Sequence, residues 1–101
     1  MKSHSLTLAL LLVASAAQAQ TPPPVDRQAR AWAASCAACH GTGGQSVGGI
    51  PPIGRDKDAI YRALLEFKNN QRPAATVMHQ HAKGYTDDEL RRIAAVFAAT
   101  K

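Results

Sequence analysis

The sequence predicts an all-α domain of three or four short helices joined with one long glycine-rich loop. Two segments carry apolar residues at helical spacing: Ile60, Leu64 and Phe67 in one, and residues 90–97 in the other. Six of the fourteen residues at 41–54 are glycine and two are proline, so this stretch is expected to be a loop with several turns. No segment shows the apolar and polar alternation of a strand.

Each expected helix has a start or stop signal in the sequence. Asp26 is placed to cap the first helix, and Gly84 is a favoured residue at the end of the third. Thr86 and Glu89 form a capping box at the start of the last helix. The expected helices lie at 25–38, 56–69, 74–83 and 86–99.

The first nineteen residues have the pattern of a secretory signal peptide. Lys2 gives a positive start, residues 6–13 form a largely apolar run, and residues 17–19 (Ala-Gln-Ala) form a small-x-small cleavage site. The run is well short of the roughly twenty apolar residues that cross a membrane. We therefore expect residues 1–19 to be cleaved, not retained as an anchor helix, which leaves a periplasmic chain without a membrane span.

Cleavage would leave 82 of the 101 residues: a proline-rich linker at 20–25 and one domain at 26–101. A domain of this size builds only a marginal side-chain core, so a disulfide, metal or bound group is expected to add stability. The chain carries 12 Lys and Arg against 7 Asp and Glu, for a net charge of +5. Because these charges are interleaved, they indicate a solvated surface, with no nucleic-acid-binding stripe.

Cys36, Cys39 and His40 form C-x-x-C-H, the pattern of covalent c-type haem attachment. Residues i and i+3 of a helix face the same way, so both cysteines can form thioethers along one porphyrin edge while His40 lies under the iron. A Cys36–Cys39 disulfide would close only a tiny loop and add little stability. A thioredoxin-like pair would need a βαβ setting, and His79-x-His81 lacks the histidine spacing of zinc modules.

The identity of the second axial ligand of the iron determines whether a haem protein transfers electrons or binds small molecules. Met78 is the one methionine left after residue 1, and it lies on the third expected helix, far in sequence from His40. Met78 is therefore the leading candidate, with His79 and His81 as alternatives. The loop glycines are expected to let the backbone turn tightly and approach a flat ligand; they are Gly41, Gly43, Gly44, Gly48 and Gly49.

These residues together resemble the class I cytochrome c family. CAACH comes early, the glycine loop leads to Pro51-Pro52-Ile53-Gly54, and an apolar helix ends the chain. The segment ATVMHQHAKGYTDDELRRIAAVFA is similar to the haem subunit of flavocytochrome c sulfide dehydrogenases and related small periplasmic monohaem cytochromes. The resemblance covers about residues 26–99. It implies a small class I cytochrome c fold in which helices and the glycine-rich loop surround one covalently bound haem.

The resemblance also assigns roles to individual residues. It implies that Met78 is the sixth ligand, that the Pro51 carbonyl accepts a hydrogen bond from Nδ1 of His40, and that Ile53 packs on the haem. Pro52 is an alternative for either of the last two roles.

The sequence departs from the family pattern where its first and last helices cross. Gln28 stands where a glycine is often found and Val96 where a tyrosine is common. Ala29 is therefore expected to provide the close approach of the two helices.

We expect a one-electron carrier, not an enzyme, whose partners are a redox protein donor and acceptor. The resemblance suggests a flavoprotein dehydrogenase subunit as one of them. The alternative function is a haem sensor or peroxidase-like module with an open or displaceable sixth site. For Arg55 and Lys57 a solvated charge is expected in preference to contact with a haem propionate.

Overall fold

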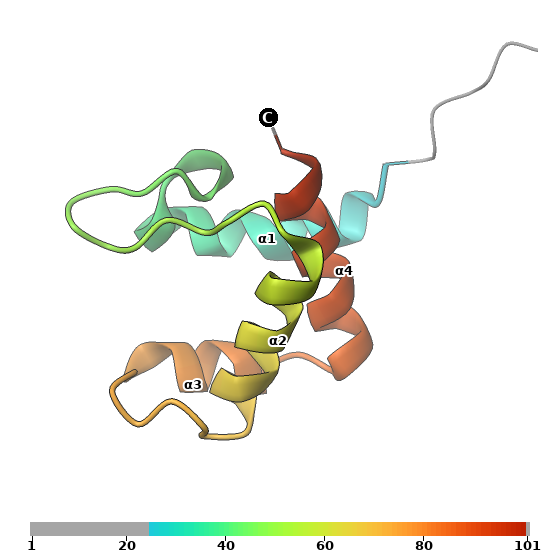
Figure 1. The fold of residues 1–101 in the computed structure, drawn as a ribbon. Helices are drawn as coiled ribbons and strands as arrows, with labels where there is room; N and C mark the ends of the chain where they lie inside the picture. Colours follow the sequence, from blue (N-terminus) through green and yellow to red (C-terminus); the bar gives the residue numbers. More distant parts are fainter. Residues whose placement is uncertain (1–24, 101) are drawn as a thin grey trace, which may run out of the picture.

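A computed structural model of the chain describes residues 25–100. It contains α1 (Arg27–His40), the short 3₁₀ helix η1 (Thr42–Gly44), α2 (Lys57–Lys68), α3 (Val77–Lys83) and α4 (Asp87–Ala99) (Figure 1). The all-α prediction is confirmed, since no strand occurs between residues 25 and 100. The predicted signal peptide at 1–19 and most of the predicted linker at 20–25 lie outside the described residues.

Helix α1 has the predicted N-cap, but it begins at Arg27, two residues later than the predicted residue 25, and it ends later than predicted. Asp26 is its N-cap, and its Oδ1 accepts a hydrogen bond from the backbone N–H of Ala29 at 3.0 Å. The helix continues to His40, two residues beyond its expected end, so the whole C-x-x-C-H motif is helical. Gly41, with φ of +82°, follows it. The loop then makes the 3₁₀ turn η1, within the segment 41–54 that is predicted to be a loop with several turns.

Helix α2 has a defined cap at each end. Asp56 accepts a hydrogen bond from the N–H of Ala59 at 3.0 Å. At the other end Asn70 adopts a left-handed φ of +56°, a conformation that asparagine tolerates better than most residues. The N–H of Gln71 then donates to the Glu66 carbonyl at 2.8 Å, which forms a Schellman motif. This cap directs the chain into the turn that leads to α3.

Helix α3 is shorter than expected, because it begins at Val77 and the sequence predicts a start near residue 74. The preceding residues form a turn instead, in which the N–H of Ala75 donates to the Arg72 carbonyl at 3.0 Å. Helix α4 begins with the predicted capping box: the Thr86 hydroxyl accepts from the N–H of Glu89, and the Glu89 carboxylate accepts from the N–H of Thr86.

Helix α4 lies at the centre of the fold and packs on both α1 and α2, while α3 packs on α2 (Figure 1). The core consists of Ala33, Leu90, Ile93 and Phe97, all at most 5% exposed. Burial of these apolar side chains is the main stabilising contribution that the protein supplies. Among residues 25–100, no helix combines the length and the hydropathy needed to cross a membrane.

The crossing of α1 and α4 uses a small residue and an ion pair. Ala29 is fully buried, as expected for a close approach of the two helices. Arg92 of α4 donates two hydrogen bonds to Asp26, at 2.7 and 2.9 Å, and one to the Gln28 side chain at 3.2 Å. Its guanidinium also lies 4.8 Å from the ring centroid of Trp32, within the range of a cation–π interaction.

Candidate functional site

A cavity of about 720 Å³ separates the loop and the end of α1 from α3 and the turn before it. This volume lies in the usual range for ligand and cofactor pockets. Helix α2 supplies another wall, and the apolar residues predicted for one face of it, Ile60, Leu64 and Phe67, line the cavity. They are only half-buried, and α2 contains no buried residue. The apolar face of α2 is therefore left for an apolar occupant.

The end of α1 places the C-x-x-C-H residues on this cavity. Cys36, Cys39 and His40 all line it, on the last two turns of a continuous helix. Cys36 is half-buried and Cys39 is exposed. Burial raises the pKa of the Cys36 thiol above its ordinary value, so that thiol is protonated near neutral pH in the chain without haem.

A hydrogen bond fixes the orientation of the His40 ring. The Nδ1 atom of His40 lies 2.7 Å from the carbonyl oxygen of Pro51, and a carbonyl can only accept, so Nδ1–H donates. In the neutral ring the free lone pair is then on Nε2, the atom available to a metal. The contact is made by Pro51, whereas Pro52 lines the cavity without it.

Ile53 lines the cavity and also packs against the buried core. Its N–H donates to the carbonyl of Gly44 at 2.8 Å, and a Cβ on Gly44 would lie 2.7 Å from that of Ile53. The loop glycines have positive φ values as expected, but none of the five lines the cavity, so the expected approach to a flat ligand is wrong. Gly44 instead permits close packing of the chain on itself.

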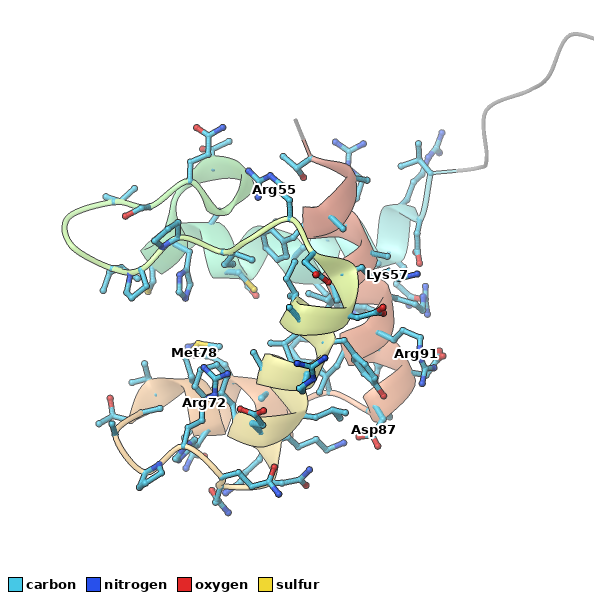
Figure 2. All side chains as sticks on the ribbon, in the orientation of Figure 1. Arg55, Lys57, Arg72, Met78, Asp87 and Arg91 are labelled. Carbon is cyan, nitrogen blue, oxygen red and sulfur yellow. The ribbon has the colours of Figure 1, made fainter. Side chains whose placement is uncertain are left out.

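Met78 lies on the opposite wall, on the first turn of α3. It is half-buried and extends from α3 toward the part of the molecule that contains α1 (Figure 2). His81, one turn later on α3, also lines the cavity. His79 does not, because its Nε2–H donates to the carbonyl of Arg72 at 2.8 Å. The structure thus separates the two histidines that the sequence left as equivalent alternatives.

Among residues 25–100, three acidic or basic side chains other than histidine line the largely apolar cavity: Arg55, Asp56 and Arg72. Arg55 donates to the carbonyls of Ile53 and Gly54 at 3.2 and 3.3 Å, whereas Lys57 does not line the cavity. Arg72 was missed by the sequence analysis, since it follows the end of α2 and its direction depends on the turn at 69–76. Its place within the helix-breaking segment Asn-Asn-Gln-Arg-Pro at 69–73 was the only available signal.

An all-helical domain with C-x-x-C-H facing an apolar cavity is the arrangement of a class I cytochrome c. Comparison with known proteins agrees. Residues 23–95 match the family model described as "Cytochrome C oxidase, cbb3-type, subunit III". The chain belongs to this cytochrome c family and is a class I monohaem cytochrome c.

Two relatives give the same result. The chain is 43% identical over 83 residues to the "Cytochrome subunit of sulfide dehydrogenase" of Chlorobaculum tepidum, covering 81% of this chain and 74% of that protein. It is 32% identical over 69 residues to "Cytochrome c-554(548)" of Halomonas halodenitrificans, covering 64% of this chain and 83% of that protein. The cofactor is therefore covalently attached haem c, and the chain is an electron carrier.

Proposed function

We propose that the chain is a periplasmic one-electron carrier whose haem iron is bound axially by His40 and Met78. The observation that supports this most strongly is that Cys36, Cys39, His40 and Met78 line one apolar cavity from opposite walls. When bound, the haem supplies an iron that alternates between the ferrous and ferric states. The chain's own residues then attach the group, orient the ligands and exclude water.

Cys36 and Cys39 attach the haem in this proposal. Their two sulfurs would hold the haem as thioethers, each through one sulfur–carbon bond to a side group of the porphyrin. The cysteines are at i and i+3 on α1, so both sulfurs reach the same edge of the group. His40 follows directly and is held on the face that α1 presents to the cavity.

The bond between His40 and Pro51 orients the proximal ligand. Donation from Nδ1 to the carbonyl directs the Nε2 lone pair away from Pro51 and holds the ring in one orientation. Met78 approaches from the α3 wall, and its thioether favours the reduced iron and raises the reduction potential. Ile53 and the apolar face of α2 surround the group and lower its exposure to water.

For the partner, we propose a flavoprotein dehydrogenase of the sulfide-oxidising type. The relative named as the cytochrome subunit of sulfide dehydrogenase supports this, because the match covers most of both chains. Without Lys2 of the predicted signal peptide, 11 Lys and Arg remain against 7 Asp and Glu, and this net charge of about +4 favours a partner with an acidic surface, since opposite charges accelerate association by roughly 10- to 1,000-fold at low salt. Electron-transfer rates should therefore fall as salt is added.

Carbon monoxide binding tests the carrier function. A ferrous protein with both axial positions filled by the chain should not bind carbon monoxide at neutral pH. The oxidised protein should also be reduced rapidly by a flavoprotein sulfide dehydrogenase. The Met78→Ala, His81→Ala double variant is the control that opens the sixth position, because His81 lines the same cavity wall. Rapid binding by the unmodified protein would instead indicate the haem sensor or peroxidase-like function.

A further inference from the structure

Four residues join the end of α2 to the first turn of α3: Glu66, Phe67, Arg72 and His79. The Nε of Arg72 donates to Oε2 of Glu66 at 2.7 Å, and the Arg72 guanidinium lies 4.9 Å from the centroid of the Phe67 ring. The Arg72 carbonyl accepts from Nε2–H of His79 at 2.8 Å. The His79 ring lies 6.2 Å from that of Phe67, at 51° to it. We call these four residues the Arg72 clamp.

We propose that Arg72 and His79 are positioning residues for Met78, and that the Arg72 clamp determines how readily an external ligand displaces Met78. The inference rests on the proposed function, in which Met78 is the sixth ligand. Figure 2 shows Arg72 and Met78 at the same end of the molecule, on the side of the cavity formed by the α2–α3 turn and α3.

Helix α3 needs such support because little else fixes its start. It has seven residues, and its N-cap Thr76 makes no side-chain capping hydrogen bond. An isolated helix of this length is not stable in water, so the position of α3 depends on tertiary contacts. Its main packing partner is α2, and the Arg72 clamp is the polar part of that contact.

The positions of Met78 and His79 on α3 make the coupling direct. Consecutive residues of a helix point about 100° apart, so Met78 faces the cavity while His79 faces the turn at Arg72. A hydrogen bond from His79 to Arg72 therefore fixes the rotation of the first turn of α3. Rotating or lifting this turn to release Met78 requires that the bond break.

The parts of the clamp have different strengths. The Glu66 and Arg72 side chains are 31% and 45% exposed, so their ion pair alone contributes little. The hydrogen bond from His79 to the Arg72 carbonyl connects the turn to α3. Stacking on Phe67 holds the Arg72 side chain over an apolar surface. We expect loss of the His79 bond to raise the affinity for an external ligand about 3- to 10-fold, the effect of one net hydrogen bond.

The test measures imidazole binding to the oxidised, haem-loaded protein by loss of the weak near-infrared sulfur-to-iron band. His79→Leu should raise imidazole affinity by about 3- to 10-fold, and His79→Gln, whose amide can still donate to the Arg72 carbonyl, should raise it less. Gln80→Leu places the same side chain at the neighbouring exposed position of α3 and should leave the affinity unchanged. Arg72→Lys keeps the charge but not the stacked, planar donor, and should also raise the affinity.

The outcomes separate this inference from the proposed function. If His79→Leu and Arg72→Lys match the unmodified protein in imidazole affinity while the sulfur-to-iron band is present, the clamp does not position Met78 and only the inference fails. If His79→Leu and Gln80→Leu raise the imidazole affinity by the same factor, the inference is also overturned. If the unmodified protein lacks the band, the assignment of Met78 as ligand fails. If His79→Leu does not retain haem, the imidazole affinity of Arg72→Lys is compared with that of the unmodified protein instead.

Discussion

Replacing Gly44 with alanine should destabilise the fold through a contact that the structure identifies directly. Gly44 has φ of +75°, and a Cβ there would lie 2.7 Å from Cβ of Ile53 and 3.3 Å from Cδ1 of Phe97. Two costs add. An L-residue in the left-handed region costs roughly 1–2 kcal/mol, and overpacking of a filled site costs about 1–3 kcal/mol more. The Gly44→Ala protein should therefore lose about 2–5 kcal/mol of the free energy of unfolding.

Gly48→Ala is the matched control for this variant. Gly48 has φ of +56°, but a Cβ there would meet nothing within 4 Å. Gly48→Ala should show only the backbone cost of roughly 1–2 kcal/mol, and any gain from a stiffer unfolded chain is common to both variants. The difference between the two variants therefore isolates the contact with Ile53 and Phe97.

The assay is denaturant unfolding of the two haem-loaded variants, followed by circular dichroism, with thermal melts alongside. In a domain of this size each kcal/mol corresponds to about 4–8 °C in Tm, so the two variants should be separated clearly. Equal losses in both would refute the reasoning, because they would show that the loop yields around Gly44 without cost. A larger loss in Gly48→Ala would refute it as well.

Three further predictions follow from other contacts. In a Met78→Ala chain, His81, which shares the cavity wall, should bind the iron and give a low-spin spectrum without the sulfur-to-iron band. The Met78→Ala, His81→Ala double variant should be high-spin and bind carbon monoxide. The hydrogen bond from Arg92 lowers the pKa of Asp26 from 3.8 to about 2. The stabilisation by the Asp26 carboxylate is complete above pH 3.8 and is lost as the pH falls toward 2, so Asp26→Asn should flatten the decrease of Tm across that interval. Ile93→Ala, at a side chain that is 2% exposed, should lower the free energy of unfolding by about 2–5 kcal/mol in urea titrations.

Local signals in the sequence were sufficient to predict the N-caps of α1 and α4. Asp26 and the Thr86–Glu89 capping box act within one turn, so their effect does not depend on the rest of the fold. The start of α3 was predicted too early, at residue 74 and not at Val77. The difference arises in the turn after Asn70, whose left-handed conformation belongs to a cap that asparagine signals only weakly.

The cavity residues show a second limit of prediction from the sequence. The spacing of Ile60, Leu64 and Phe67 predicts an apolar helix face, and this face exists, but periodicity is the same whether a face packs on protein or on a cofactor. In the structure it lines the cavity. The glycine loop was misread for a similar reason: a positive φ permits close approach to any surface, and at Gly44 that surface is Ile53.

The two histidines of α3 could not be separated from the sequence, because their directions depend on where α3 begins and how the preceding turn orients it. The hydrogen bond from His79 to Arg72 spans seven residues and has no local pattern. His81 lies on the cavity wall one turn beyond Met78. Which side chains share a cavity is thus a property of the tertiary arrangement, even where each helix is predictable.

The most direct test of the central assignment is the absorption spectrum of the oxidised, haem-loaded protein beside that of its Met78→Ala variant. If His40 and Met78 bind the iron from opposite walls of the cavity, the unmodified protein should show the near-infrared sulfur-to-iron band and the variant should lose it. Absence of the band from the unmodified protein, or its persistence in the variant, would contradict the assignment.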